Sequence, residues 1–475
     1  PKCNVCRISA PTVASLYDSC MLLRFSCKNF RSIREEQVLS LRAVNTRTDE
    51  RNESLLDTQA KHVKALRCAA IYGSNASGKS NVLRAMNCCS RMVAESQRNW
   101  NPTGGIPTWD PFALDEVSKT GETEFQVDFE IGSITFNYGF RFNARIILEE
   151  WLTDETGRGK TLFRRETDSS KTTLVFPGRN LGGTSEDAKH LEGIRLQMRP
   201  NSLFLSAAAQ GGHSMLSSVF EWISHNLKTV SAGGPALRYP TAEGCSVPER
   251  KQQIKALLAF ADVGIKDFEV ADEEPPERLK KLRSALLSAI NEASPEHPIS
   301  SDAFSKSLQS IRMLHAGLNG SLYPLDFDTE SSGTRAYFEL LGPLLDGLAS
   351  ASCLLVDELE SSLHPNLSKQ LIGIFNDSKM NPKGAQLIFN THDTNLLDLS
   401  LLRRDEIWFT EKTQEGATEL TRLAEFVPRK GQNIANAYLH GRFGATPFLD
   451  DELLWSILKS LYEAKPSPIS EIEAS

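Results

Sequence analysis

The stretch Gly73-Ser74-Asn75-Ala76-Ser77-Gly78-Lys79-Ser80 decides the fold of this chain. It follows an apolar, strand-like run over 68–72 and leads into a helical pattern from Asn81 onward. Strand, loop and helix in this order match the phosphate-binding pattern G-x-x-x-x-G-K-[ST]. The glycines let the backbone approach a phosphate, and the amides of the loop and helix start point at the anion. Lys79 would reach the β- and γ-phosphates of ATP, and Ser80 would offer its hydroxyl to Mg²⁺. The alternative is an ordinary glycine-containing turn.

The composition is that of an ordinary globular protein. The chain has 475 residues, of which 40% are hydrophobic and 24% charged, and this length is typical of two or three domains. The net charge of -7 excludes an overall polycation that coats nucleic acid, but it leaves room for a local basic groove. No apolar run approaches the roughly 20 residues that span a bilayer, so we expect no membrane partner.

The cysteines indicate the cellular compartment, and the first residues indicate where the folded part of the chain begins. The nine cysteines are mostly scattered, which favours a reducing cytoplasm over a disulfide-bonded secreted protein. A zinc site built from Cys3-x-x-Cys6 with Cys20 and Cys27 is an alternative, but the two later spacings are irregular and Cys27 lies in a strand pattern. Residues 1–20 precede Met21 and a clean strand pattern, so we expect a disordered upstream extension, with Met21 as the natural start.

A second predicted strand ends in two carboxylate side chains that could serve the phosphate site. Leu354-Leu355-Val356-Asp357-Glu358 is an apolar run that ends in two adjacent carboxylates. In a doubly wound sheet, ligands bind at the carboxyl ends of the strands, beside a phosphate loop. Asp357 would then hold Mg²⁺, directly or through water, and Glu358 would polarise the attacking water. The alternative is a strand that simply ends in solvated carboxylates.

Two more segments contain residues that could contact the γ-phosphate of a bound nucleotide. Ser331-Ser332-Gly333-Thr334-Arg335 opens an amphipathic helix, and small residues at a helix start expose amide donors. The alternative is an ordinary serine N-cap. His392 follows the buried strand pattern 385–389 and could reach the γ-phosphate or the water, although an isolated histidine there would more often be a surface residue.

Phosphate loop, serine-glycine signature, Asp-Glu strand and histidine, in this order, resemble the ABC-type ATPase heads. The opening residues 23–32 and the acidic stretch 357–365 resemble the RecF/SMC/OLD branch. More narrowly, several segments resemble the RloA-like ATPases of bacterial restriction and phage-defence loci. These segments are 330–335, 391–397, 404–409 and 438–448.

The resemblance implies a mechanism. Two heads would sandwich two ATP molecules, so that Ser331 and Gly333 of one subunit contact the γ-phosphate held by Lys79 of the other. Ser361–His364 would form the D-loop, and Gln210 would be the Q-loop glutamine that couples nucleotide state to an insertion. ATP binding would close the dimer and hydrolysis assisted by Glu358 would open it. No arginine is assigned to the transition state, and Arg31 and Arg335 are the candidates.

The expected site therefore combines separate stretches of the chain. Its catalytic residues are Glu358 and His392, and its magnesium ligands are Ser80 and Asp357. The expected ATP-binding residues are Gly73, Ser74, Asn75, Ala76, Ser77, Gly78, Lys79, Ser80, Asn81, Ser331, Gly333 and Gln210.

The expected fold class is α/β: an ABC-type ATPase head with a mixed phosphate-loop sheet, an antiparallel β subdomain and a helical insertion. Residues 21–210 would form the N-terminal lobe, with a β-meander that turns at Gly132-Ser133. Residues 211–320 would form the insertion, and residues 321–475 the C-terminal lobe. We expect helices in the insertion over 214–228, 249–261, 277–292 and 302–316.

Three functions compete. The first is an ATP-driven conformational switch in a prokaryotic anti-phage or restriction-type complex. It would control a separate effector nuclease of the RloB type, because no acidic triad indicates a nuclease domain in this chain. The second is a DNA-repair ATPase that binds DNA directly, like the RecF and SMC heads, and the acidic charge and the lack of long coiled coils argue against it. The third is a scaffold that binds but does not hydrolyse ATP.

Overall fold

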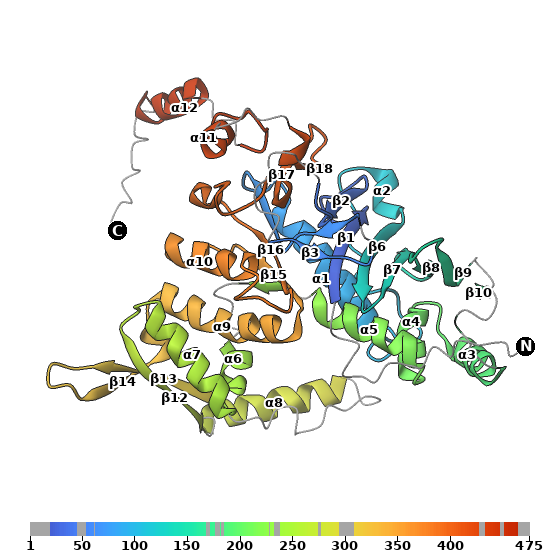
Figure 1. The fold of residues 1–475 in the computed structure, drawn as a ribbon, viewed down its shortest axis with the longest axis horizontal. Helices are drawn as coiled ribbons and strands as arrows, with labels where there is room; N and C mark the ends of the chain where they lie inside the picture. Colours follow the sequence, from blue (N-terminus) through green and yellow to red (C-terminus); the bar gives the residue numbers. More distant parts are fainter. Residues whose placement is uncertain are drawn as a thin grey trace, which may run out of the picture.

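The computed structural model describes residues 20–44, 54–60, 62–167, 172–175, 181, 185–227, 229–231, 238–273, 277–293, 308–426, 433–446 and 451–463. The expected extension over 1–20 lies outside these residues except for Cys20, and so does the Cys3-x-x-Cys6 motif. Figure 1 shows the two main sheets side by side at the centre, with a smaller unit below them.

The first sheet carries the phosphate-loop segment. Its strand order is β11-β15-β16-β5-β17-β18, and all neighbours are parallel except β17 and β18. The strands are β11 (Thr229–Ser231), β15 (Cys353–Asp357), β16 (Gln386–Asn390), β5 (Cys68–Gly73), β17 (Ile407–Lys412) and β18 (Thr418–Arg422). Parallel strands covered on both faces read as continuous apolar runs, which is why the sequence shows them so clearly.

The second sheet is antiparallel, with the order β10-β9-β8-β7-β6-β1-β2. Its strands are β1 (Cys20–Lys28), β2 (Gln37–Ser40), β6 (Thr123–Ile131), β7 (Ile134–Phe142), β8 (Ile147–Asp154), β9 (Lys160–Thr167) and β10 (Thr172–Val175). β6 and β7 join at Gly132, which adopts φ 58° at the predicted turn. The mixed phosphate-loop sheet with an antiparallel β subdomain is thus confirmed. The short pair β3 (Leu56–Asp57) and β4 (Lys64–Ala65) forms a separate two-stranded sheet that packs against β1.

Helix α1 (Lys79–Glu95) lies between the two sheets. One apolar core joins its buried side chains to both of them; it includes Leu83 and Met86 of α1, Ile71 and Ile388 of the parallel sheet, and Phe125 and Phe140 of the antiparallel sheet. A second core covers the other face of the parallel sheet under α9 (Ser332–Ser350) and α10 (Pro365–Asn376). Successive residues of β5 alternate between the cores, with Ile71 in the first and Tyr72 in the second.

Helices α4 (Phe204–Gln210) and α5 (Ser214–Asn226) pack beside α1, α3 (Ser185–Gln197) packs against α4, and α2 (Glu116–Thr120) is a short helix ahead of β6. Helix α5 runs antiparallel to α1. The Ser90 hydroxyl donates to the Ser224 carbonyl, and farther along the chain the Thr229 hydroxyl donates to the Leu83 carbonyl. Residues that follow α5 therefore return toward the start of α1.

The insertion contains a sheet as well as helices. Helices α6 (Arg238–Gly244) and α7 (Pro248–Phe260) pack against the antiparallel strands β12 (Ile265–Glu273), β13 (Leu308–Ala316) and β14 (Leu322–Asp326), and α8 (Glu277–Ala293) follows β12 in the chain. The predicted helix over 302–316 was wrong where the structure describes it, because 308–316 is β13. The buried Ile311 and Met313 lie two residues apart, which is the period of a strand, and pairing with β12 on one side and β14 on the other fixes the extended form.

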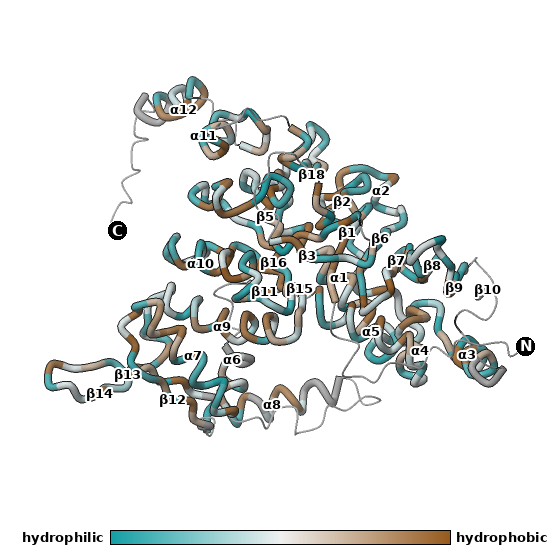
Figure 2. The backbone as a smooth tube through the Cα atoms, viewed as in Figure 1, coloured by the Kyte–Doolittle hydropathy of each residue, from teal (hydrophilic) through white to brown (hydrophobic). Residues whose placement is uncertain are grey.

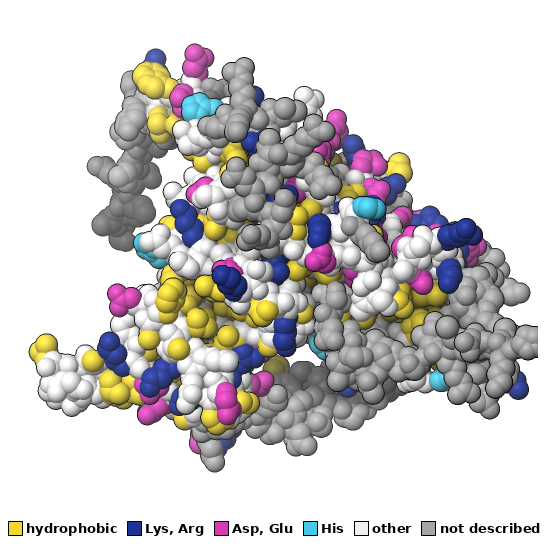
Figure 3. Space-filling view, in the orientation of Figure 1, with side chains coloured by type: hydrophobic (Ala, Val, Ile, Leu, Met, Phe, Trp, Pro, Cys, Tyr) yellow, Lys and Arg dark blue, Asp and Glu magenta, His cyan; other side chains and the backbone are white. Residues whose placement is uncertain are grey.

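Two apolar surfaces lie at the periphery, away from both cores. The hairpin of β13 and β14 projects at the left of Figure 1, and Figure 3 shows yellow side chains on it; Leu318, Leu322, Tyr323 and Leu325 are exposed there. Helix α11 (Ile434–Leu439) packs on the second core through Ile434 and Tyr438. Helix α12 (Asp451–Glu463) lies farther out, at the top left of Figure 1. Figure 2 shows hydrophobic stretches on α12, where Leu454 and Trp455 are exposed. Among the described residues, no helix is both long enough and apolar enough to span a membrane.

Candidate nucleotide site

Only glycine fits at two points of the loop between β5 and α1. Gly78 caps α1 with φ 107°, a conformation that side chains disfavour. A Cβ on Gly78 would collide with the Thr418 hydroxyl, and one on Gly73 would lie 2.5 Å from the Ser77 hydroxyl. The first amides of α1 have no acceptor within the helix and carry its positive dipole end. The loop therefore has the close approach and the donors that an anion needs.

The C-terminal hairpin of β17 and β18 braces this loop. The Ser77 hydroxyl lies 2.6 Å from the Thr410 hydroxyl, and the Thr418 hydroxyl donates to the Ser77 carbonyl over 2.8 Å. Ser32, on the turn after β1, lies 2.8 Å from the Thr418 hydroxyl and accepts from the Asn81 amide over 2.7 Å. Sequence reasoning missed these contacts, because single hydroxyl residues on distant strands carry no local signal.

Lys79 is buried against its own loop. Its ammonium donates to the carbonyls of Gly73 and Ser74, each over 2.9 Å. Burial lowers the pKa of Lys79 to about 8, and the charges of Glu360, Glu358 and Asp357 only partly offset that effect. Three carboxylates at the end of β15 and on the turn after it thus act on the one lysine of the loop.

The predicted magnesium ligands meet directly. The Ser80 hydroxyl at the start of α1 donates to Oδ1 of Asp357 at the end of β15 over 2.8 Å. Within the described ranges, no group of three or more His, Cys, Asp or Glu side chains could hold a metal. One carboxylate and one hydroxyl still fit Mg²⁺, which commonly keeps several waters and takes further oxygens from substrate phosphates. The ion would neutralise phosphate charge there.

Asn390 joins these groups, and sequence reasoning missed it. It ends β16, the strand between β5 and β15, and it is fully buried. Its Nδ2 donates to Oδ1 of Asp357 over 2.5 Å and to the Ser80 hydroxyl over 3.3 Å, while its Oδ1 accepts the backbone N–H of Glu358 over 2.5 Å. The available signal was its place beside His392 at the end of an apolar strand.

Glu358 and His392 lie on adjacent turns. Glu358 is exposed and adopts φ 56°, in the left-handed region that non-glycine residues rarely occupy. The His392 backbone N–H donates to Oε1 of Glu360 over 2.6 Å. Partial burial and then the charge of Lys79 lower the pKa of His392, so its imidazole is neutral near pH 7. The charge of Glu358 opposes this effect on the pKa of His392.

Ser331 and Gly333 lie at the start of α9. The Ser331 hydroxyl caps the helix by accepting from the Thr334 N–H over 3.1 Å. A Cβ on Gly333 would lie 2.5 Å from the carbonyl of Ser362, so this glycine packs against the turn after β15. Just before Ser331, the Glu330 carboxylate lies 2.7 Å from Nε2 of His315 on β13, which connects the insertion to the helix start. Among the described residues, the contacts of Ser331 and Gly333 are local, and none joins either residue to Lys79.

The structure does not bring Gln210 to the loop. Gln210 ends α4, which packs on the far end of α1, where the Ser206 hydroxyl donates to the Val93 carbonyl over 2.6 Å. Val93 lies roughly 20 Å along α1 from Lys79, at 1.5 Å per residue. Because α5 follows α4 and runs antiparallel to α1, Gln210 lies beyond that far end.

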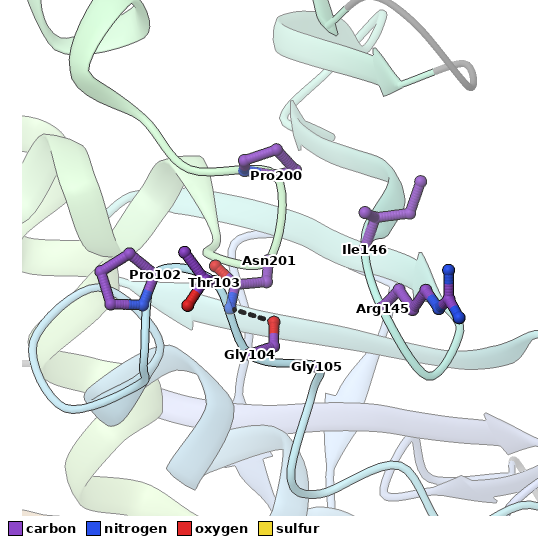
Figure 4. Close-up of a pocket in the computed structure, with 8 residues that line it drawn as sticks. All are labelled: Pro102, Thr103, Gly104, Gly105, Arg145, Ile146, Pro200 and Asn201. Carbon is purple, nitrogen blue, oxygen red and sulfur yellow. Dashed lines mark hydrogen bonds between the residues drawn. The ribbon is translucent and has the colours of Figure 1, made fainter.

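A surface pocket lies on the same far side of α1. It measures about 480 Å³ and is lined by Pro102, Thr103, Gly104, Gly105, Arg145, Ile146, Pro200 and Asn201. Figure 4 shows the Asn201 amide directed at the Gly104 carbonyl, to which it donates over 3.1 Å. The pocket includes no residue of the loop or of the β15 and β16 turns, so it is separate from the nucleotide site.

The depressed pKa of Lys79 predicts proton uptake on ATP binding. At pH 9 most of this lysine is neutral in the nucleotide-free protein, because its pKa is about 8. A bound polyphosphate favours the ammonium form, so binding takes up a proton above pH 8, and ATP affinity falls as the pH rises from 7 to 9. Calorimetry in two buffers of different ionisation enthalpy measures that uptake.

Lys412 provides the control for this prediction. Burial lowers its pKa too, but its ammonium donates to the Gly416 carbonyl at the hairpin turn. Lys412→Met should leave the proton uptake unchanged. Equal uptake at pH 7 and pH 9 in the unmodified protein would contradict the assignment to Lys79.

Comparisons with known proteins complete this description. Residues 68–398 match a family model described as "AAA domain, putative AbiEii toxin, Type IV TA system", whereas no curated protein matches. The solved SMC head domain from Thermotoga maritima is 13% identical, with a TM-score of 0.34, over 84% of this chain and 98% of that chain. The SMC head bound to the C-winged helix domain of ScpA is 13% identical, with a TM-score of 0.35, over 84% of this chain and 96% of that chain. Because the family model spans well over half of the chain, from β5 to beyond His392, the chain belongs to this AAA-domain family of P-loop ATPases.

Proposed function

We propose that the chain hydrolyses ATP and that ATP joins two copies of it into a closed dimer, which acts as a conformational switch in a prokaryotic defence complex. The observation that carries this proposal is the 2.8 Å contact between Ser80 and Asp357. It joins the phosphate-loop helix to the acidic strand end across 277 residues of sequence. Glu358, the next residue, is exposed beside them.

The chemistry is attack of water on the γ-phosphorus of ATP, with release of ADP and phosphate. The loop amides and Lys79 would hold the β- and γ-phosphates, and Ser80 and Asp357 would hold Mg²⁺. Glu358 would accept the proton of the attacking water. His392 would donate from its neutral imidazole to an oxygen of the γ-phosphate. Positioning and charge neutralisation supply most of the rate enhancement in reactions of this class.

A second copy would complete the site. Gly333 packs against the Ser362 turn of its own chain and Ser331 caps its own helix, so neither is seen to reach the γ-phosphate end of the loop in the same chain. The α9 start of another copy would supply the donors of a helix start, in an isologous arrangement where each chain gives a loop to one site and a signature to the other.

Family membership supports the proposed biological setting. The family description names a putative toxin of a type IV toxin–antitoxin system, which favours a role in defence. The segments 391–397 and 438–448 resemble RloA-like ATPases, so we propose a separate RloB-type effector nuclease as the partner and the cytoplasm as the location. The alternative is a repair ATPase that binds DNA directly, and salt-sensitive DNA binding by the isolated protein would favour it.

Mixing two inactive variants tests the shared site. Lys79→Ala disables the loop, and Gly333→Ala disables the signature because its Cβ would meet the Ser362 carbonyl. In a mixed dimer, one site has an intact Lys79 from one chain and an intact Gly333 from the other. We expect each variant alone to be inactive and the mixture to regain ATPase activity, measured as phosphate release.

Gly373→Ala is the matched control. Gly373 lies in α10 with open space where a Cβ would be, so this change should leave activity intact and add up to about 1 kcal/mol of stability. Melting curves must show that Gly333→Ala is folded. If the folded variants fail to complement each other, the shared site is wrong. If Gly333→Ala alone is as active as the unmodified protein, the signature role fails.

A further inference from the structure

We propose that Asn390 is a positioning residue that aligns the magnesium ligands with the catalytic carboxylate. This inference rests on the proposed function and deepens it. Asn390 touches both predicted magnesium ligands with its Nδ2 and holds the backbone N–H of Glu358 with its Oδ1. One side chain thus connects the metal side of the site to the water-activating side.

Chemistry fixes the orientation of the Asn390 amide. Asp357 Oδ1 and the Glu358 N–H face it from β15. A carboxylate oxygen is an acceptor and a backbone N–H is a donor. The amide nitrogen must therefore face Asp357 and the amide oxygen must face Glu358. A flipped amide would set acceptor against acceptor and donor against donor. Both bonds can form at once only in the observed orientation.

Strand order explains why this position suits the role. β16 lies between β5 and β15, and its last residue therefore lies between the ends of the two strands that bear the loop and the acids. The side chain is fully buried, so water does not compete for its bonds. Asp357 Oδ1 accepts from Ser80 and Asn390 together, which leaves Oδ2 and the remaining lone pairs of this carboxylate for other partners.

The Glu358 contact controls the backbone at the catalytic residue. Glu358 has φ 56°, and a non-glycine residue holds such a conformation only where its surroundings enforce it. Asn390 binds the Glu358 N–H, and the Asn390 carbonyl accepts the N–H of Leu359 over 3.2 Å. Asn390 therefore ties two consecutive amides of this turn to the end of β16 and sets the direction in which Glu358 leaves the strand.

Asn390→Ala tests the inference, with Asn390→Ser as a second variant that keeps a small polar group if the first fails to fold. We expect kcat to fall about tenfold or more and Mn²⁺ affinity to weaken by a similar factor, because residues that hydrogen-bond to metal ligands have effects of this size. The KM for ATP should change little, since the loop amides and Lys79 are intact. Mn²⁺ is titrated into protein saturated with a non-hydrolysable ATP analogue and followed by electron paramagnetic resonance.

Asn226→Ala is the matched control. Asn226 also bridges two groups: its Nδ2 donates to the Trp222 carbonyl and its Oδ1 accepts the Cys353 N–H over 3.1 Å. Cys353 begins β15, so this asparagine supports the same strand at the opposite end. Asn226→Ala should lower the melting temperature without changing Mn²⁺ affinity or kcat.

The outcomes separate the inference from the proposed function. If both Asn390 variants fold and keep the Mn²⁺ affinity and kcat of the unmodified protein, the positioning role is overturned while ATP hydrolysis stands. If Asn226→Ala weakens Mn²⁺ as much as Asn390→Ala does, the effect is general loss of structure and the inference also falls. If the unmodified protein shows no turnover but its Mn²⁺ affinity depends on Asn390, the proposed function fails and the positioning role remains.

Discussion

Lys79→Ala should abolish ATP binding while leaving the nucleotide-free protein folded. The ammonium is the one side-chain cation of the loop, and charge-assisted bonds of this kind contribute about 1.5–3 kcal/mol each. Two such bonds to phosphate correspond to a loss of at least about 100-fold in affinity. Without ATP the lysine is buried with a pKa lowered to about 8, so its charge costs stability in the empty protein. We therefore expect little change in the melting temperature of the empty protein and complete loss of the rise that ATP produces.

Calorimetry and melting curves with Mg²⁺ and ATP check this result. Lys412→Ala, which removes a lysine whose pKa is also lowered but which bonds a hairpin carbonyl, should bind ATP normally. Retained ATP binding by Lys79→Ala would mean that the loop holds something other than a polyphosphate. A large drop in the stability of the empty variant would mean that the bonds from Lys79 to Gly73 and Ser74 outweigh the cost of burial.

Glu358→Gln should stop hydrolysis without stopping ATP binding. Glutamine has the shape of glutamate and cannot accept the proton of the attacking water. Loss of a general base costs about 100- to 10,000-fold in rate. The side chain is exposed and its backbone N–H remains bonded to Asn390, so the fold and the loop should be unaffected. ATP would then remain bound, and the closed dimer would accumulate.

Single-turnover hydrolysis and light scattering after size exclusion measure the two consequences. Glu419→Gln, on an exposed position of β18, should behave like the unmodified protein in both. Unchanged turnover and an unchanged oligomeric state in Glu358→Gln would remove Glu358 from the mechanism and favour a scaffold that does not hydrolyse ATP. Slow hydrolysis without a trapped dimer would separate catalysis from head closure.

The sequence predicts elements well where one stretch carries the whole signal. β5, the loop and α1 were predicted because strand, glycines, lysine and helix follow one another within about 30 residues, as in other βαβ-type units. β15 and β16 were predicted because parallel strands buried on both faces are continuous apolar runs. The β6–β7 hairpin was predicted from alternation on both sides of Gly132.

Prediction from the sequence fails where contacts between residues far apart in the chain determine the local structure. Residues 308–316 read as helix because Leu308, Ile311 and His315 also fit a helical spacing, and only pairing with β12 makes them a strand. Asn390, Thr410 and Thr418 each contact a residue of the loop or of the start of α1 that lies 310 to 341 positions earlier in the sequence. A lone polar residue on a strand has no local pattern, so such contacts emerge only from the fold.

The expectation for Gln210 shows the same limit. The residue ends an apolar run, as a coupling glutamine would, but Phe204–Gln210 forms a short helix instead of a strand beside the loop. The N–H groups of Phe204 and Leu205 are bound by the buried carboxylate of Glu150 on β8. That carboxylate fixes α4 on the antiparallel sheet at the far end of α1, and nothing in the local sequence indicates this attachment.

The position of β5 has a consequence for how the protein is made. Both of its neighbours, β16 and β17, come from the last third of the chain, more than 300 residues after the loop. During synthesis the loop strand therefore leaves the ribosome long before either flanking strand exists, and closing so long a loop is slow. We expect nascent chains that end before residue 386 to be unable to bind ATP. A messenger RNA truncated before the codon for residue 386 would yield a fragment that cannot bind ATP. No partly translated copy could then act as a switch.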